Sequence, residues 1–452
     1  MRITREPKIR VGLISGAAEA RFTLSGRFDS NERKLVEGDH VAYAESGAVR
    51  LAGLAPAPQI TLSPSDFKLC RFTVHDVKIG IEFHWERLES QQFQGILTLA
   101  ADGDRLTIIN ELPLESYLIS VISSEMSAAC PVELLRAHAI VSRSWLLSQL
   151  EKNPADNVKQ GIHSVGSSEE IIRWYDRESH HGFDVCADDH CQRYQGIGKA
   201  FSQLAFDAVL DTRGKALVYD GKICDTRYSK SCGGVTEEYR AAWEDKNVPY
   251  LASIYDGEGK QPSAYGMPLT VEENAEAWIT ASPPACCGMV SPELLSRIVP
   301  DFDQKTLDSF RWRVDYTQDE LNEILRSRYG PDFGAIRDLK ALERGLSGRI
   351  IKLRIDGEKR SLVIGKELEI RRGLSRSHLY SSAFVVRARQ NSSNYPTGFS
   401  IIGAGWGHGV GLCQIGAAVL ADRGTAHQAI LSHYFKSAEL ADIYQHRFDP
   451  QD

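Results

Sequence analysis

One glutamate lies where helical spacing would bring it beside an apolar face. The face consists of Leu114, Leu118, Val121 and Glu125, at positions i, i+4, i+7 and i+11. Partial burial disfavours the charged form of a carboxyl group, which is how proteins obtain a general acid near neutral pH. Glu125 is therefore a candidate catalytic acid. The alternative is a structural carboxylate, paired for example with Arg143 from the next helix, because ion pairs are commoner than catalytic acids.

A second group brings two kinds of metal ligand together within twelve residues: His180, His181, Cys186, His190 and Cys191. Two thiols and two imidazoles suit tetrahedral zinc, whereas a loop disulfide or free thiols are the alternatives. Four protein ligands leave no open position, so the predicted site is structural, with His180 chosen over its neighbour as the fourth ligand. A zinc hydrolase is a further hypothesis, but it requires an open position on the metal.

A third group precedes the Gly233-Gly234 pair and consists of Tyr228, Lys230 and Ser231. Lys230 could stabilise developing negative charge or bind a sugar substituent, with the other two as substrate contacts. The alternative is a solvated lysine on a strand.

Trp406 and His408 lie within GAGWGHGVG (403–411), where Gly405, Gly407, Gly409 and Gly411 occupy every second position. This period favours an extended strand with close backbone approach over a phosphate-binding turn into a helix. The two side chains could line a sugar-binding groove, or they could only pack beneath the glycines.

A helical hairpin would position Glu125. Pro113 and Pro131 stand where helices often begin, and Glu115 suits the positive first turn of the first helix. The inner face of the second helix is predicted to consist of Leu134, His138, Val141 and Trp145. A polar loop is expected to follow at about 150–200.

The flanking segments are rich in alternating apolar and β-branched residues, which is typical of strands, and Asp102-Gly103 favours a hairpin turn. We predict an α+β fold with β-rich flanking domains around a helical-hairpin catalytic core. The expected parts are a β-rich N-terminal domain (1–110), the catalytic core (111–255) with its Cys/His loop (176–196), a mainly helical subdomain (256–345), which includes TQDELNEILRSRY, and a β-rich C-terminal part with a closing helix, TAHQAILSHYF (346–452).

The composition is that of an ordinary globular protein, with 452 residues, 42% hydrophobic and 25% charged. A net charge of −7 argues against a dedicated nucleic-acid binder. Nine cysteines are an odd and clustered set, which favours local chemistry over a disulfide scaffold.

No apolar run approaches the roughly 18 residues of a bilayer span. The N-terminus begins with basic residues, but its longest apolar stretch, Val11–Ser15, is shorter than the roughly 7–15 residues of a signal core. The expectation is either a cytoplasmic chain or a start downstream of a removed export signal.

Three motifs resemble the sporulation stage II protein D (SpoIID) and LytB family, in family order. They are LPLESYLISVISSEM with CPVELLRAHAIVSRSWLL (112–147), SCGGVTEEYRAAWEDKNVPYL (231–251) and GAGWGHGVGLCQIGAAVLADRGTAHQAILSHYF (403–435). The chain departs from the family pattern at His138, where glutamine is usual, at Ser144-Trp145, where Thr-Tyr is usual, and at Cys413, where serine is common.

The resemblance implies a peptidoglycan lytic transglycosylase that cuts MurNAc-GlcNAc linkages of peptide-stripped glycan strands. It makes Glu125 the catalytic acid and Arg143 a residue needed for activity. The hypothesis that Lys230 assists comes from its position before the glycine pair and not from the resemblance. One carboxylate suffices, because the muramic acid 6-hydroxyl is the nucleophile and a 1,6-anhydro product results, whereas ordinary glycosidases need two acids. Arg143 could hold the lactyl carboxylate of the substrate or tune Glu125 by its charge.

LytB proteins imply the alternative, a non-catalytic peptidoglycan-binding enhancer of a cell-wall amidase. Some family members also carry a similar His and Cys loop that binds zinc, followed, as here, by Gln192 and Tyr194. The expected partners are glycan strands and a cell-wall amidase. The expected location, inferred from the substrate, is the cell envelope.

Overall fold

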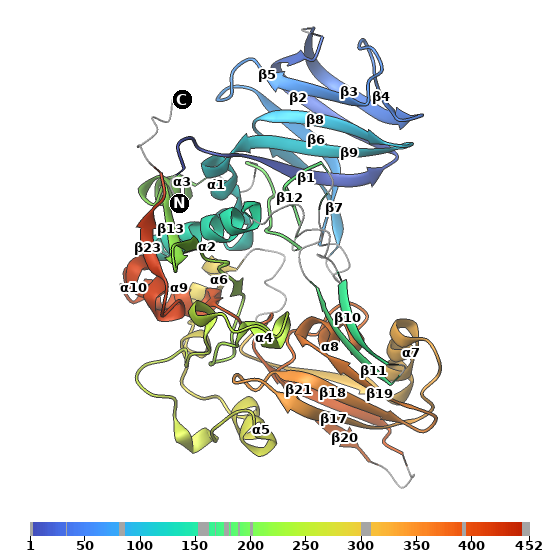
Figure 1. Cartoon of the computed structure of the whole chain (residues 1–452), viewed down its shortest axis with the longest axis vertical. Coiled ribbons are helices and arrows are strands. Elements are labelled where there is room, and N and C mark those ends of the chain that lie inside the picture. The colour runs from blue at the N-terminus through green and yellow to red at the C-terminus, as the bar shows by residue number, and fades with distance from the viewer. Residues whose placement is uncertain are drawn as a thin grey trace. The chain divides into compact units, whose positions relative to one another are not determined.

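The computed structural model describes residues 3–32, 34–80, 86–151, 162–167, 169–175, 180, 182–188, 190–198, 202–299, 309–390 and 395–444. It is a mixed α/β structure rich in strands, as the sequence predicts (Figure 1). The chain divides into two compact units. Unit 1 comprises residues 1–150, 179–216 and 441–452, and unit 2 comprises residues 151–178 and 217–440.

Unit 1 is built on a ten-stranded sheet, in which the strand order is β12-β1-β9-β8-β5-β2-β3-β4 and β6 pairs with β2 and β7. Its strands are β1 (Lys8–Ala17), β2 (Glu19–Ser30), β3 (Leu35–Glu45), β4 (Ala48–Leu51), β5 (Gln59–Pro64), β6 (Arg71–Ile79), β7 (Arg87–Phe93), β8 (Ile96–Asp102), β9 (Arg105–Pro113) and β12 (Val185–Cys186). The predicted hairpin at Asp102-Gly103 is confirmed, because Asp102 pairs with Arg105 and Gly103 has a φ of +59°.

Three helices complete unit 1: α1 (Leu114–Glu125), α2 (Val132–Leu150) and α3 (Gln203–Asp211). Pro113 is the N-cap of α1, and α1 packs against α2, α3 and strand β9. The predicted inner face of α2 is buried, together with most of the rest of that helix. A helix with apolar residues on nearly every side is expected at the centre of a unit.

Unit 2 contains a five-stranded sheet of order β10-β11-β19-β18-β17, a three-stranded sheet of order β16-β21-β20, and the pair β15-β22. Its strands are β10 (Ile162–Ser167), β11 (Glu170–Tyr175), β14 (Lys222–Ile223), β15 (Tyr228–Ser229), β16 (Arg311–Thr317), β17 (Ile336–Arg344), β18 (Ile350–Gly357), β19 (Ser361–Gly365), β20 (Phe384–Arg389), β21 (Gly398–Ala404) and β22 (Leu412–Cys413). Strands β13 (Lys215–Tyr219) and β23 (Glu439–Asp442) each cross a boundary of the division.

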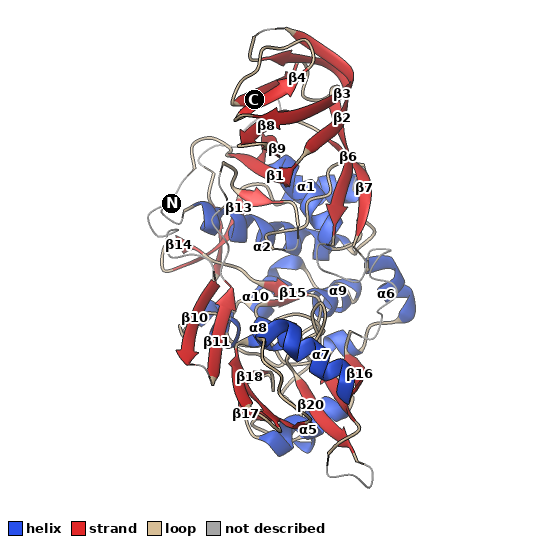
Figure 2. Ribbon diagram, turned by 90° about the vertical axis from the view of Figure 1, so that its right-hand side faces the viewer, coloured by secondary structure: helices blue, strands red, loops and turns tan. Residues whose placement is uncertain are grey.

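The helices of unit 2 are α4 (Tyr239–Ala242), α5 (Glu272–Thr280), α6 (Pro292–Ile298), α7 (Gln318–Tyr329), α8 (Glu367–Gly373), α9 (Gln414–Asp422) and α10 (His427–Tyr434), with short 3-10 turns η2 (Pro249–Leu251), η3 (Ser263–Tyr265) and η4 (Cys286–Gly288). Helix α8 packs on β11, β18 and β19, and α7 packs on β16 and α8 (Figure 2). A continuous apolar core lies beneath them, including Trp312, Leu353 and Phe399.

Two expectations about these segments need correction. Residues 256–345 are not mainly helical throughout, because β16 and β17 lie among α5, α6 and α7. The expected polar loop at 150–200 contains the hairpin β10-β11, and β11 pairs in parallel with β19. Strand β16 pairs with the distant β21 and β11 pairs with the distant β19, and the local sequence pattern does not record such partners. Among the described residues, no helix combines the length and apolar character that a membrane span requires.

Candidate functional site

Glu125 is the last residue of α1 and is half-buried, whereas Leu114, Leu118 and Val121 on the same face are fully buried. The predicted spacing is therefore realised. The Oε1 atom of Glu125 accepts a hydrogen bond from the backbone N–H of Arg193 at 2.9 Å. This bond orients the carboxylate at the C-terminal end of the helix.

The segment 192–196 is attached along α1 by further hydrogen bonds. They run from Tyr117 Oη to Gln192 Oε1 (3.2 Å), from Ser120 Oγ to Gly196 O (2.7 Å) and from Gln195 N to Ser124 Oγ (3.3 Å). Tyr194 is buried, and its hydroxyl donates to Asn110 Oδ1 at 2.6 Å. Whatever fixes the start of this segment therefore also fixes the backbone N–H that holds Glu125.

Arg143 pairs with Glu115, ten residues before Glu125, which the structural alternative had given as its partner. Its Nε donates to Glu115 Oε1 at 3.0 Å and its Nη2 donates to Oε2 at 2.5 Å, while Nη1 donates to the carbonyl of Lys215 at 3.0 Å. Arg143 is 0% exposed. Its guanidinium nitrogens are all engaged by these bonds, which tie α2 to α1 and to Lys215.

Other charged and polar groups surround this ion pair. The Glu115 carboxylate accepts a hydrogen bond from the Tyr444 hydroxyl at 2.8 Å, and the Glu115 N–H donates to Glu6 Oε1 at 2.9 Å. Glu6 also pairs with Arg213 at 2.5 Å. Burial raises the pKa of Glu6, an effect that the hydrogen bond from Glu115 opposes, and burial likewise raises the pKa of Tyr444. The sequence marked Glu115 only as a first-turn acid, because its partners come from distant segments.

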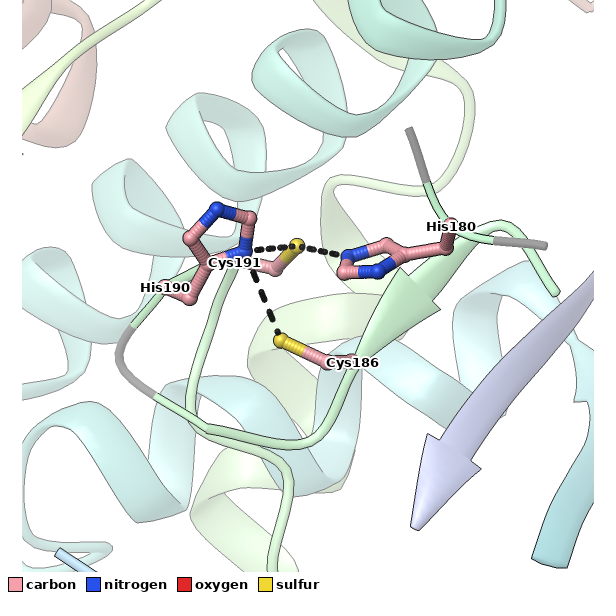
Figure 3. A group of neighbouring side chains, drawn as sticks. All are labelled: His180, Cys186, His190 and Cys191. Atoms are coloured by element: carbon pink, nitrogen blue, oxygen red, sulfur yellow. Dashed lines mark hydrogen bonds between the residues drawn. The ribbon is translucent and has the colours of Figure 1, made fainter. Parts of the chain in front are cut away.

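The predicted zinc ligands lie together in unit 1. His180, Cys186, His190 and Cys191 each offer a ligand atom, and these atoms all lie within 4.8 Å of one another (Figure 3). The closest pairs are His180 Nε2 with Cys191 Sγ (3.2 Å), His190 Nδ1 with Cys191 Sγ (3.5 Å) and His190 Nδ1 with Cys186 Sγ (3.7 Å). His181 lies outside the described residues.

Strand pairing and ring stacking hold this group in place. Cys186 ends β12, which pairs in parallel with β1 through Val11↔Val185 and Gly12↔Cys186. The His180 ring stacks on Phe183 at 4.6 Å between centroids. Hydrogen bonding to Cys191 and to the two histidines lowers the pKa of the Cys186 thiol to about 2, against the effect of burial. Such an environment favours the thiolate, the form that binds metals.

In unit 2 the structure joins the two groups that the sequence treated separately. The backbones of Ser231 and Trp406 form an antiparallel bridge with N–H to O distances of 3.1 and 2.8 Å. Tyr228 lies in β15, which pairs in parallel with β22, and the carbonyl of Lys230 accepts from the N–H of Ile415. Lys230 and Tyr228 are half-buried, whereas Ser231 is 0% exposed, so the Ser231 hydroxyl does not face solvent.

The GAGWGHGVG segment is not the extended strand that its period suggests. Strand β21 ends at Ala404, and Gly405, Gly407, Gly409 and Gly411 all have positive φ, between +74° and +92°. The prediction was wrong because alternate left-handed glycines produce the same period as a strand. Close backbone approach is confirmed, since a Cβ on Gly411 would lie 2.2 Å from the carbonyl oxygen of Arg227. The segment leads through β22 into α9.

His408 accepts a hydrogen bond at Nδ1 from the N–H of Val410 at 3.0 Å. Its ring packs against Trp243 at 4.9 Å, and Arg227 lies over the same Trp243 ring at 4.4 Å. Burial, and then the nearby arginines Arg227 and Arg349, hold the pKa of His408 well below its usual range. His408 is therefore a neutral imidazole at physiological pH.

The candidate residues thus fall into two groups, one in each unit. Unit 1 holds Glu125, Arg143 and the His/Cys group, and unit 2 holds the groups around Lys230 and His408. Sequence reasoning missed Glu115 as the partner of Arg143 and the Arg193 N–H as the donor to Glu125. A backbone N–H leaves no signal in a sequence.

The sequence comparisons agree with the motifs and the fold around Glu125. Residues 102–219, which include α1, α2 and the His/Cys group, match the family model described as Stage II sporulation protein. Residues 237–411 match a second family, described as a domain of unknown function, DUF8618. Residues 102–219 are therefore similar to the Stage II sporulation protein family, and the resemblance inferred from the motifs is confirmed.

Individual relatives extend the similarity over most of the chain. The chain is 23% identical to the Stage II sporulation protein D of Bacillus amyloliquefaciens over 74% of this chain and 76% of that protein. It is 24% identical to an uncharacterized protein of Brachyspira hyodysenteriae over 81% and 77% of the two chains. It is 21% identical to the amidase enhancer of Bacillus subtilis over 72% of this chain, spanning 40% of that relative's length.

Proposed function

We propose that this protein is a lytic transglycosylase of cell-wall glycan strands, with Glu125 as the acid and then the base. The observation that carries the proposal is the half-buried Glu125 carboxylate at the end of α1, held by the Arg193 N–H. This group has the burial and the fixed orientation that general acid catalysis requires. The sequence similarity to Stage II sporulation protein D supports this proposal.

In the proposed reaction one carboxyl group serves both steps. Glu125 donates its proton to the glycosidic oxygen as the bond to C1 of the muramic acid breaks. The 6-hydroxyl of the same sugar attacks C1, and its proton passes to Glu125. The products are a 1,6-anhydro end and a free sugar hydroxyl. Water is not consumed, so no second carboxylate is needed to activate it.

Arg143 is proposed as a positioning residue. It is fully buried and bound to Glu115, so it would act by fixing α1 against α2. In unit 2 we propose Lys230, Tyr228 and Trp406, which are all half-buried, as sugar contacts. Ser231 and the neutral His408 would instead support the backbone on which these side chains stand.

We further propose that His180, Cys186, His190 and Cys191 hold a structural zinc ion. A tetrahedral zinc with bonds of about 2.3 Å to sulfur and 2.0–2.1 Å to nitrogen separates S and N ligands by about 3.6 Å. The S–N distances of 3.2 to 3.7 Å bracket that value. The ion would fix the start of the 192–196 segment, and with it the Arg193 N–H that holds Glu125.

The test compares the wild-type protein with Glu125→Gln on peptide-free glycan strands, with products identified by mass spectrometry. Glutamine can still accept from the Arg193 N–H but cannot donate the proton of an acid. We expect 1,6-anhydro ends from the wild type and a loss of at least about 100-fold in the variant, the usual contribution of a general acid. Glu111→Gln is the control, because the Glu111 carboxylate pairs with the exposed Lys8 at 3.6 Å on the sheet of unit 1.

The amidase enhancer relative favours a second candidate, a peptidoglycan-binding protein that stimulates an amidase. If the protein is such an enhancer, neither the wild type nor the Glu125→Gln variant cleaves glycan. Both bind it, and both raise the rate of a cell-wall amidase equally. Stimulation of an amidase without anhydro products would therefore replace the transglycosylase proposal. Either function puts the protein in contact with peptidoglycan, which lies outside the cytoplasmic membrane.

A further inference from the structure

Four buried side chains with ligand atoms meet in unit 2, from four segments far apart in the sequence. They are Cys232 after β15, Asp256 after the η2 turn, Cys287 in η4, and Cys413 at the end of β22. Their ligand atoms all lie within 4.8 Å of one another, and none of the four residues is more than 2% exposed. No local motif joins them, so the sequence alone gave no sign of this group.

The spacing fits one small ion. Zinc–sulfur bonds of about 2.3 Å at tetrahedral angles separate two sulfurs by about 3.8 Å. Cys232 Sγ and Cys287 Sγ are 3.7 Å apart. Cys232 Sγ lies 3.2 Å from Asp256 Oδ2, a few tenths of an ångström closer than an S–O edge of about 3.6 Å. The Asp256 carboxylate would need to move away from Cys232 Sγ by only a few tenths of an ångström to make room for the ion.

Backbone N–H groups donate hydrogen bonds to two of the three sulfurs. Cys413 Sγ accepts from the N–H of Cys232 at 3.2 Å and from the N–H of Gly416, in the first turn of α9, at 3.4 Å. Cys232 Sγ accepts from the N–H of Gly234 at 3.3 Å. Such N–H groups are the outer partners that typically hold ligand atoms in place around a bound metal ion.

The carboxylate is oriented in the manner of a ligand. Asp256 Oδ1 accepts from the Tyr434 hydroxyl at 2.8 Å and lies 3.3 Å from His433 Nε2, which leaves Oδ2 directed at the sulfurs. Ligating carboxylates are typically held by such outer partners. Arg349, which is 0% exposed, donates to the carbonyl of Cys232 at 3.1 Å and adds a buried positive charge beside the anionic group.

Other readings of the group fit less well. A disulfide requires sulfurs about 2.05 Å apart, which the 3.7 Å pair does not approach. Simple core cysteines would not need a carboxylate among them, whereas Asp256 lies within ligand distance of all three sulfurs. A cluster of several irons would spread its cysteines over different metal atoms and hold the sulfurs further apart than a single ion does.

We propose that Cys232, Asp256, Cys287 and Cys413 bind a second, fully buried structural zinc ion. All four positions would be protein ligands, so the ion has no place for water or substrate. It would tie the Ser231–Trp406 bridge to the η4 turn and to the N-terminus of α9. The inference is independent of the proposed function, because it concerns the folding of unit 2 alone.

The test is the metal content of the purified full chain, measured by plasma mass spectrometry under reducing conditions. We expect about two zinc ions per chain in the wild type, and about one in a Cys186→Ser/Cys191→Ser variant, because four-ligand structural sites bind independently. Cys287→Ser and Cys413→Ser should each lose the other ion. Cys224→Ser is the matched control, a buried cysteine of unit 2 outside both groups, and should keep both.

Cobalt substitution keeps the test decisive if the Cys287 or Cys413 variants do not fold. The Cys186→Ser/Cys191→Ser chain loaded with Co²⁺ should then still show the sulfur-to-metal charge-transfer bands of a thiolate-rich tetrahedral site. Complete loss of metal and of these bands in that chain would overturn the proposal. A Cys232–Cys287 disulfide in peptide mapping of the natively purified protein would also overturn it.

Discussion

At the scale of single residues, the main surprise is which carboxylate Arg143 binds. Pairing of Arg143 with Glu125 was the structural alternative from the sequence, yet Arg143 forms a bidentate pair with Glu115, and Glu125 instead accepts from a backbone N–H. The two glutamates of α1, Glu115 and Glu125, therefore have different partners and different roles. Glu115 stabilises the interior of unit 1, and Glu125 keeps a half-buried carboxylate on which the proposed chemistry rests.

Removing the arginine should destabilise unit 1 strongly. Arg143→Ala leaves the Glu115 carboxylate buried without its cation, and such losses cost about 3–5 kcal/mol. Denaturant unfolding followed by circular dichroism measures the change. Arg387→Ala is the control, since Arg387 pairs with Glu276 at the surface, and it should alter stability by no more than about 1 kcal/mol.

A double variant separates an unpaired charge from lost packing. Combining Arg143→Met with Glu115→Gln removes both charges, so it should unfold at a higher denaturant concentration than Arg143→Ala alone. If the double variant were as unstable as the single one, the buried charge would not be the cause of the loss.

At the scale of elements, helices with local signals were predictable and elements that depend on partners were not. Helix α7 is confirmed from TQDELNEILRSRY, and its Thr317–Glu320 capping box supplies a local reason for its start. The closing helix α10 is confirmed as well. The hairpin β10-β11 was missed; β10 pairs with β11, and β11 pairs in parallel with β19, a strand from a distant part of the chain that the local sequence does not reveal.

The loop after α8 makes unit 2 sensitive to acid. Burial, and then Arg371, Arg372 and Arg328, lower the pKa of His378 to about 3. Below the unfolded pKa of about 6.5 the unfolded chain binds a proton that the folded chain refuses, so stability falls as the pH falls from there towards 3, by at most about 1.4 kcal/mol per pH unit.

His378→Gln should remove this contribution. Thermal unfolding between pH 7 and pH 4 should show a shallower loss of stability in the variant than in the wild type, because glutamine does not titrate in this range. Parallel profiles for the wild type and His378→Gln would show that His378 is protonated equally in both states.

At the scale of the whole molecule, unit 1 is assembled from three separated stretches of chain. The last of them enters the unit through Ile443 and Tyr444. Ile3 donates its N–H to the carbonyl of Ile443 at 2.7 Å, and Ile443 donates to the carbonyl of Gly214 at 2.8 Å. The Tyr444 hydroxyl then reaches Glu115, more than three hundred residues earlier.

A short truncation at the C-terminus should therefore destabilise unit 1. A chain ending at Leu440 loses the buried Ile443 and the bond from Tyr444, whereas a chain ending at Tyr444 keeps both. We expect a lower unfolding temperature for the shorter chain, and a cost of about 1 kcal/mol for Tyr444→Phe, which removes one hydrogen bond. Equal unfolding temperatures for the two truncated chains would contradict this account of unit 1.

The sequence by itself determined the features that short-range spacing encodes. Helices α1 and α2, the apolar face leading to Glu125, the β8-β9 turn and the closeness of His180, Cys186, His190 and Cys191 each involve residues near one another in the sequence. Side-chain periodicity and ligand spacing record such proximity directly.

Only the tertiary structure decided the pairings between distant segments. The choice of Glu115 by Arg143, the bridge from Ser231 to Trp406, and the meeting of Cys232 with Asp256, Cys287 and Cys413 each join residues that no local pattern relates. The left-handed glycines of residues 405–411 belong here too, because a period of two is shared by a strand and by alternate turns. Packing energy selects among such possibilities, and it depends on neighbours that come together only when the chain has folded.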